Sequence, residues 1–219
     1  MNRILSYWLV ISLATTMAAF AKEPENIILT KQKLVQYHDS GQYDKDIQQV
    51  LHQAKRYLSS RLNQADFAGK KPAIVLDIDE TSLSNYTDIV KFDFGGTVDI
   101  IRKAEDEGKD PAIPETLQLY QFAKAHDVAV FFLTGRKEEE RVVTSGNLKK
   151  TGYANWDKLI LRDGEYKNKP AAIYKTAMRK EITQQGYDIV FSIGDQQSDL
   201  VGGYADKTYK LPNPYYFIP

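Results

Sequence analysis

The side chains best placed for chemistry are Asp77 and Asp79, two carboxylates that directly follow the apolar run 73–76. In an extended segment, residues two apart project the same way, so these two carboxylates can converge. Converging carboxylates repel each other unless a cation or a shared proton compensates. The economical interpretation is a divalent metal site in which one aspartate remains free to act on a substrate.

Other polar residues follow other apolar runs. The run 128–133 leads into Thr134 and Gly135, and the run 189–193 leads into Gly194 and Asp195. Ligands of an open parallel sheet bind at the carboxyl ends of its strands, so groups far apart in sequence should meet in one crevice. The set expected there is Asp77, Asp79, Thr134, Lys175, Asp195 and Asp199.

The residue types in this set favour a hard cation and a phosphate. Carboxylate oxygens from Asp77 and Asp195 suit Mg²⁺, which needs few protein ligands and accepts a phosphate oxygen. Soft ligands are missing, because the chain has no cysteine and its three histidines (His38, His52 and His126) lie outside the motifs. Lys175 can neutralise charge, and the Thr134 hydroxyl can donate to a phosphate oxygen.

The elements that must position these groups alternate between strands and helices, which predicts an α/β fold with a parallel sheet flanked by helices. We expect strands at 73–76, 128–133, 159–161, 189–193 and 209–210, and helices at 43–62, 115–125, 137–150 and 170–186. Residues 22–40 read as a polar lead-in. Residues 82–112 read as an irregular insertion with short helical patches.

The amino-terminal 21 residues have the pattern of a cleavable export signal, with Arg3, an apolar stretch and a small-x-small end. An uncleaved anchor helix is the alternative. Cleavage would leave residues 22–219 as a single domain that is not stably inserted in a membrane and is periplasmic or secreted. That domain has 28 basic and 29 acidic residues, a net charge of −1, which gives no reason to expect nucleic acid or an anionic membrane as a partner.

The motifs together resemble those of the haloacid dehalogenase (HAD) superfamily of phosphatases. The matching features are Asp-x-Asp-Glu-Thr at 77–81, Thr134 after a buried strand, Lys175, and Gly-Asp-x-x-x-Asp at 194–199. Residues 40–219 resemble the acid phosphatase branch that includes secreted bacterial phosphatases and plant vegetative storage proteins. Ser82, Asp88 and Gly135 depart from the related lipoprotein-type acid phosphatases, which bears on substrate preference.

The resemblance implies a Rossmann-like (HAD-type) fold with a small helical cap at 82–112 and a role for each motif residue. It implies that Asp77 is the nucleophile that forms an aspartyl-phosphate and that Asp79 is the general acid and base. It implies that Thr134, Gly135 and Lys175 bind the phosphoryl group. Mg²⁺ would be held by Asp77, the Asp79 carbonyl and Asp195, and Asp199 would complete or orient this shell.

Plainer interpretations remain for single residues. Asp77 and Asp79 could cap a helix, and Lys175 could be a solvated lysine, with Lys167 and Lys169 as its rivals for the third motif. We expect Arg136 and Arg141 to be surface ion-pair partners of Glu138–Glu140. The aromatic residues of the insertion could line a substrate pocket or simply pack the cap: Tyr86, Phe92 and Phe94.

The expected activity is Mg²⁺-dependent hydrolysis of small phosphomonoesters, with nucleoside monophosphates as candidate substrates because the cap is short. Two alternatives stay open: a non-catalytic storage or binding protein of the same fold, and a phosphotransferase that passes the phosphoryl group to an alcohol. The sequence leaves the physiological substrate, the pH optimum and the oligomeric state undetermined.

Overall fold

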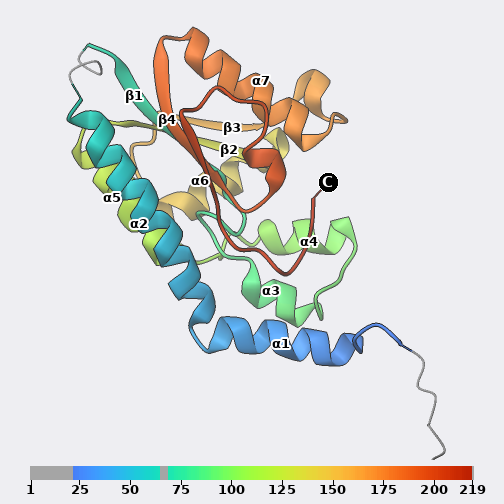
Figure 1. The fold of residues 1–219 in the computed structure, drawn as a ribbon. Helices are drawn as coiled ribbons and strands as arrows, with labels where there is room; N and C mark the ends of the chain where they lie inside the picture. Colours follow the sequence, from blue (N-terminus) through green and yellow to red (C-terminus); the bar gives the residue numbers. More distant parts are fainter. Residues whose placement is uncertain (1–21, 65–68, 219) are drawn as a thin grey trace, which may run out of the picture.

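The computed structural model describes residues 22–64 and 69–218, so the predicted export signal at 1–21 lies outside the described residues. Within them, all the strands pair in parallel in one five-stranded sheet of order β3-β2-β1-β4-β5 (Figure 1). The strands are β1 (Lys71–Leu76), β2 (Ala129–Lys137), β3 (Lys158–Arg162), β4 (Tyr187–Gly194) and β5 (Lys207–Lys210). The predicted α/β class is confirmed.

The central strand β1 is buried on both of its faces, as its unbroken apolar run predicts. Ile74 and Leu76 enter one hydrophobic core, whereas Ala73 and Val75 enter the other. The side chains alternate because successive residues of a strand point to opposite faces. This double burial fixes the strand that carries Asp77.

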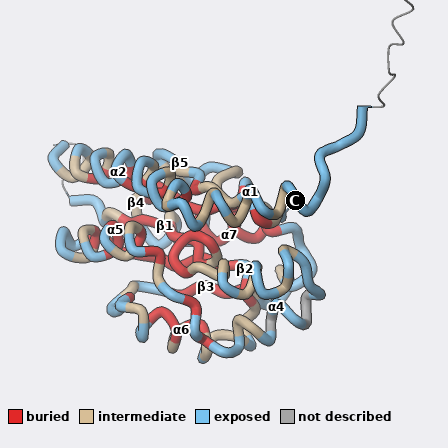
Figure 2. Tube along the Cα trace, turned by 90° about the horizontal axis from the view of Figure 1, so that it is seen from below, coloured by how far each residue is buried: buried red, intermediate tan, exposed pale blue. Residues whose placement is uncertain are grey.

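Helices cover both faces of the sheet. Helices α2 (Gln42–Leu62) and α5 (Pro114–Ala125) lie on one face, α7 (Ala171–Gln184) lies on the other, and α6 (Arg141–Lys150) follows β2. Figure 2 shows buried strands between helices whose outward sides are exposed. None of the helices in the described ranges combines the length and apolar character that crossing a membrane would need.

The insertion forms two short helices, α3 (Tyr86–Lys91) and α4 (Val98–Glu105). Both lie beyond the carboxyl ends of the strands (Figure 1). The end of the insertion is fixed by Asn147 of α6, whose side chain accepts a hydrogen bond from the Asp110 amide at 2.9 Å and donates one to its carbonyl at 2.7 Å. The predicted irregular segment is thus a small helical cover anchored at its base.

Two predicted elements differ from the structure. The expected lead-in at 22–40 contains helix α1 (Ile27–Asp39), which starts where the Asn26 side chain accepts from the Ile28 amide. The helix is stabilised by packing that periodicity could not reveal, since the His38 ring stacks on the Tyr86 ring of α3 with centroids 3.4 Å apart.

The second difference concerns the helix predicted from residue 137. Strand β2 continues to Lys137, which pairs with Arg162 of β3, and a single 3₁₀ turn at Glu138–Glu140 precedes α6. The Glu140 carboxylate accepts from the Lys137 amide and closes this turn. The helix therefore begins at Arg141, and residues 134–136 belong to the strand.

Candidate active site

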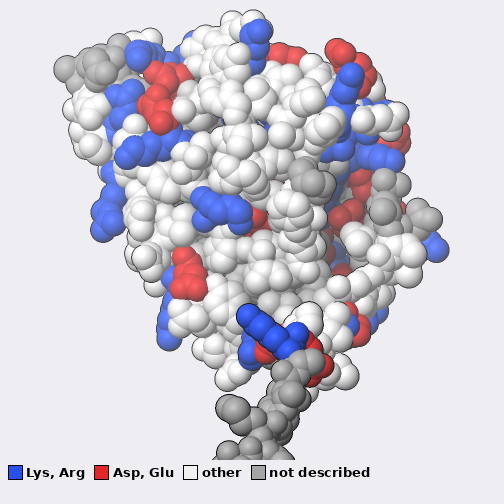
Figure 3. All heavy atoms as spheres, turned by 45° about the vertical axis from the view of Figure 1, so that its right-hand side comes forward, with Lys and Arg blue, Asp and Glu red and all other residues white. Residues whose placement is uncertain are grey.

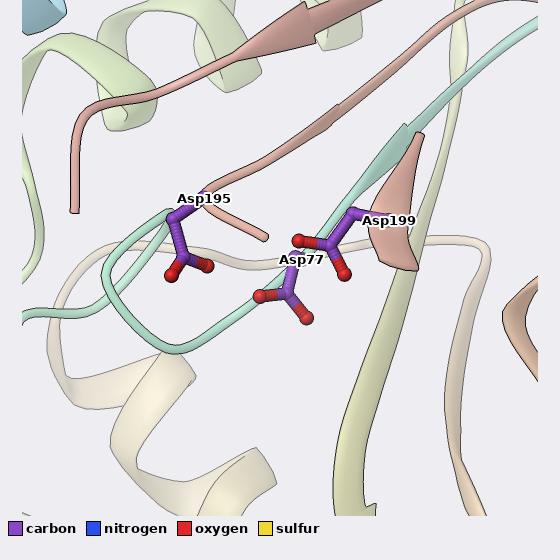
Figure 4. A group of neighbouring side chains, drawn as sticks. All are labelled: Asp77, Asp195 and Asp199. Atoms are coloured by element: carbon purple, nitrogen blue, oxygen red, sulfur yellow. The ribbon is translucent and has the colours of Figure 1, made fainter. Parts of the chain in front are cut away.

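Asp77 directly follows β1, and its side chain contacts a lysine of α7, the helix that covers one face of the sheet. The Lys175 Nζ atom of α7 lies 2.6 Å from Asp77 Oδ1 and also contacts Asp199 Oδ1. Asp77, Asp195 and Asp199 are buried, and each offers an oxygen within 4.8 Å of the others (Figure 4). The structure thus brings four predicted residues together, and Lys175 rather than Lys167 reaches Asp77, because Lys167 pairs with Glu139 outside the cluster.

The turn after β4 delivers Asp195 and Asp199, and glycine is required there. A Cβ atom on Gly194 would lie 2.2 Å from the Asp199 side chain, so any other residue would displace that carboxylate. The Asp199 carbonyl accepts from the buried Arg179 guanidinium at 2.7 Å and from the Ser192 hydroxyl at 3.0 Å. Arg179 therefore supports the site, although the sequence offered only a charged helix as its context.

Neutral donors hold the Asp195 carboxylate. Its Oδ2 atom accepts from Gln196 Nε2 at 2.6 Å and from Asn213 Nδ2 at 2.7 Å, and its Oδ1 atom accepts from the Thr81 hydroxyl at 3.3 Å. Sequence reasoning missed Asn213, because nothing in its local pattern points to a carboxylate eighteen residues earlier.

The cluster is electrostatically unfavourable without further positive charge, since one ammonium faces three carboxylates. Burial is the largest cause that raises the pKa of Asp77 well above its usual range, and the charge of Asp199 adds to it, while Lys175 opposes both. A hard divalent cation fits these residues, because the donors are all carboxylate oxygens that converge in a buried place.

Asp79 turns away from this cluster toward Arg136. Its Oδ1 atom accepts from Arg136 Nη2 at 2.6 Å and from Asn85 Nδ2 at 2.9 Å. Burial alone would raise the pKa of Asp79, but the Arg136 charge and the hydrogen bonds from Arg136 and Asn85 outweigh it and lower this pKa.

The expectation that Arg136 is a surface ion-pair partner is wrong. Its side chain is 2% exposed and bridges Asp79 to Asp110, whose Oδ2 atom lies 3.1 Å from Arg136 Nη2. The expectation placed Arg136 just before a solvated helix, but β2 continues to Lys137, so Arg136 lies in the strand and is buried. Arg141 does form the expected ion pair with Glu138.

Thr134 and Gly135 lie next to each other near the end of β2. Thr134 is buried, and its hydroxyl accepts from the Arg136 amide at 3.0 Å. Gly135 is exposed and lines the cleft. The hydroxyl of Ser82, a departure from the related pattern, donates to the Asp77 carbonyl at 2.6 Å and so stabilises the turn that carries the cluster.

A cleft of about 830 Å³ opens over these residues. In Figure 3, acidic side chains appear inside a furrow on the right of the molecule, and Lys and Arg side chains gather above it. Of the aromatic residues of the insertion, Phe92 and Phe94 line the cleft, whereas Tyr86 stacks on His38. Three aromatic side chains near the end of the chain complete the apolar wall: Tyr215, Tyr216 and Phe217.

Glu80 is a buried carboxyl beside the cluster, in a left-handed backbone conformation with φ of 48°. Its oxygens accept from the Asn85 amide at 2.6 Å and from the Tyr216 hydroxyl at 2.5 Å. Burial, with a contribution from the charge of Asp79, raises the pKa of Glu80 to about 8. Glu80 therefore acts as a neutral anchor near neutral pH.

This pKa gives a stability prediction for the metal-free protein. The folded protein keeps the Glu80 proton between its ordinary pKa of 4.5 and about 8, whereas the unfolded chain releases it. This stabilisation is complete below pH 4.5 and is lost as the pH rises to about 8. We expect Glu80→Gln to lie close to the wild type at pH 5 and to melt roughly 10 °C higher at pH 8.5.

Thermal melts in EDTA across pH 5 to 8.5 would test this prediction. The exposed Glu107→Gln is the matched control, because it changes the same residue type away from the cluster. If the wild type and Glu80→Gln keep a constant difference in melting temperature, Glu80 does not titrate in this window.

A parallel sheet with a buried acidic cluster and a lysine beside its carboxyl edge agrees with the expected HAD-type phosphatase. The family model described as HAD superfamily, subfamily IIIB (Acid phosphatase), matches residues 8–219, and the chain therefore belongs to this family of phosphomonoesterases. The expected family and the expected enzyme class are confirmed, and the family implies a small phosphate ester as substrate.

Relatives in plants support the same assignment. The chain is 39% identical to the stem 28 kDa glycoprotein of Glycine max, over 84% of this chain and 72% of that protein. It is 37% identical to acid phosphatase 1 of Solanum lycopersicum, over 80% and 69%. It is 31% identical to vegetative storage protein 1 of Arabidopsis thaliana, over 82% and 67%.

A solved structure shares the fold. The class C acid phosphatase from Bacillus anthracis superposes with a TM-score of 0.72 at 24% identity, and 86% of each chain is covered. This likeness confirms the predicted HAD-type α/β architecture.

Proposed function

We propose that this protein is an exported, Mg²⁺-dependent acid phosphatase that works through a phosphorylated Asp77. The observation that carries the proposal is the 2.6 Å contact between Lys175 Nζ and Asp77 Oδ1 inside a three-carboxylate cluster. Lys175 there holds the Asp77 carboxylate and offers positive charge to an incoming phosphate.

In the first step, an Asp77 carboxylate oxygen attacks phosphorus, and the bond from phosphorus to the ester oxygen breaks. Its electron pair stays on the leaving oxygen, which takes a proton from Asp79. Asp79 would turn from Arg136 toward the leaving oxygen for this transfer, and the negative charge of an approaching phosphate would raise the pKa of Asp79 and favour its protonated form.

In the second step, Asp79 accepts a proton from a water molecule, and the water oxygen attacks the same phosphorus. The bond from phosphorus to Asp77 breaks, which releases inorganic phosphate and regenerates the carboxylate. Throughout both steps, Lys175, the Thr134 hydroxyl and the Gly135 amide would bind the phosphoryl oxygens.

The carboxylates of Asp77 and Asp195 and the Asp79 carbonyl would hold the Mg²⁺ ion, with Asp199 completing or orienting this shell. The ion would neutralise charge on the phosphate and on the attacking carboxylate.

The cleft supports small substrates with planar leaving groups. Phe92, Phe94 and Tyr216 line the same cleft as the acidic cluster. Nucleoside monophosphates fit this combination, because a base can pack on aromatic rings while its phosphate reaches Asp77. A substrate panel tests this point, and a strong preference for sugar phosphates would contradict it.

The expected result for the function as a whole is turnover of p-nitrophenyl phosphate that EDTA abolishes and Mg²⁺ restores.

A non-catalytic storage protein is the second candidate, because one of the relatives is named a vegetative storage protein. No turnover between pH 4 and 8 with Mg²⁺ present would favour storage. Added glycerol distinguishes phosphotransfer, which would yield glycerol phosphate in place of free phosphate.

The proposal that the protein is exported rests on residues 1–21 alone. We also propose that residues 22–219 form a single domain, with residues 82–112 as its cover. The mature protein would then begin at Lys22 and fold without residues 1–21. Amino-terminal sequencing of the exported protein would test the cleavage point, and a retained leader would favour an anchored form.

A further inference from the structure

The chain after β5 returns to the acidic cluster. Residues 213–218, here called the strap, run from the sheet toward the helices of the insertion (Figure 1). Three hydrogen bonds fix the strap: Asn213 to Asp195, Tyr216 to Glu80 and the Ile218 amide to Gln196. Every one of these acceptors lies in a turn that follows β1 or β4, so the strap links the two turns that carry the cluster.

The strap also has its own packing. The Tyr215 ring lies 5.7 Å from the Tyr43 ring of α2 and 5.4 Å from the Tyr86 ring of α3, measured between centroids. The segment is therefore held between the main domain and the insertion, and its position does not depend on the contact with Asp195 alone.

Asn213 uses both ends of its amide. Its Nδ2 atom donates to Asp195 Oδ2 at 2.7 Å, while its Oδ1 atom accepts from the amides of Tyr215 at 2.9 Å and Tyr216 at 3.4 Å. The Oδ1 atom stabilises the turn of the strap, whereas the Nδ2 atom holds the Asp195 carboxylate. A substitution can therefore remove the contact with Asp195 and keep the turn.

The hydrogen bonds that hold the Asp195 carboxylate within residues 22–64 and 69–218 come from neutral groups. Asn213 and Gln196 both donate to Oδ2, and the Thr81 hydroxyl donates to Oδ1, whereas Asp77 and Asp199 share the Lys175 ammonium. A terminal carboxylate torsion is broad when nothing holds it. The two amide donors on Asp195 Oδ2 fix this torsion, so that Asp195 Oδ1 can face the other carboxylates of the cluster. Because both donors are neutral, they add no positive charge that would repel a cation.

We propose that Asn213 is a positioning residue for the divalent cation: by holding Asp195 Oδ2, it presents Asp195 Oδ1 to the ion and so sets its affinity. This inference rests on the proposed function, which places the cation among these carboxylates. Partners that orient metal ligands typically change metal affinity by about 10–100-fold when they are removed.

The substitution Asn213→Ser separates the two ends of the amide. A serine hydroxyl can still accept from the amide two residues later and keep the turn, but it is too short to reach Asp195. We expect the Mg²⁺ dissociation constant of the mature protein, measured by calorimetry without substrate, to rise about tenfold or more. At saturating Mg²⁺, we expect kcat to return near the wild-type value.

Three further variants frame the measurement. Asp195→Asn should lose Mg²⁺ binding more severely than Asn213→Ser. Phe217→Ala lies in the same strap but is 76% exposed, and it should leave Mg²⁺ affinity unchanged. If Asn213→Ser fails to fold, Asn213→Thr also keeps a hydroxyl acceptor for the turn, is too short to reach Asp195 and carries the same expectation.

The outcomes distinguish this inference from the proposed function. A wild type that binds no Mg²⁺ would contradict the proposed cation and with it the present inference. A wild type that binds Mg²⁺, together with an Asn213→Ser variant of equal affinity, would overturn the inference alone. Equal weakening by Phe217→Ala would also overturn it, because the effect would then come from loosening the strap as a whole.

Discussion

The variant Asp77→Asn should fold normally and lose turnover by roughly 10⁴-fold or more, since an amide cannot replace the attacking carboxylate. Its metal-free stability should stay equal to the wild type or rise by about 1 kcal/mol. The reason is that Asp77 stands in a buried cluster with excess negative charge, and Lys175 keeps Asp199 as a partner in the variant.

Steady-state kinetics on p-nitrophenyl phosphate and a thermal melt in EDTA would measure both effects. Asp188→Asn is the matched control, because Asp188 lies at the start of β4, away from the cluster, and pairs with Lys70 on the surface. Activity within tenfold of the wild type in Asp77→Asn would refute the nucleophile assignment.

The variant Lys175→Met should lose both activity and stability. Removing the ammonium leaves Asp77 and Asp199 buried without their shared partner, which should lower the free energy of unfolding by about 3 kcal/mol. The loss of a positive charge at the phosphoryl group should lower kcat by roughly 10²–10³-fold. Denaturant unfolding and initial rates measure the two quantities.

The control Lys180→Met lies on the same helix but is exposed, so it should change the unfolding free energy by less than about 0.5 kcal/mol. The double variant Lys175→Met/Asp199→Asn should regain part of the lost stability, because it removes one unpaired carboxylate, yet it should remain as slow as Lys175→Met. A stable and fully active Lys175→Met would return Lys167 to consideration as the phosphate-binding lysine.

The sequence predicted the strands well because their signal is local. The runs that became β1, β2 and β4 are apolar on both faces, and the polar residues that follow them mark the ligand-binding edge. Asp77, Lys175, Asp195 and Asp199 were foreseen as a group and do lie together. Their roles in catalysis remain predictions.

The supporting residues could not be predicted, because their signal is tertiary. In the sequence, Arg136 is a charged residue shortly before Glu138–Glu140, a pattern that is typical of a surface ion pair. It is buried against Asp79 because β2 extends to Lys137. Asn213 lies in an irregular segment and meets Asp195 only after the chain has crossed back from β5. Helix α1 lacks a clear apolar stripe and is held by a ring stack between His38 and Tyr86.

The single direction of the strands has a practical consequence. Their amino ends, including the short connection between α7 and β4 at Gly186, lie at the opposite end of the sheet from the cluster. The chain contains no cysteine, so one introduced at Asp188 would be the sole thiol. Coupling the enzyme to a bead or an electrode through that thiol would leave the cleft over the acidic cluster open to the solution.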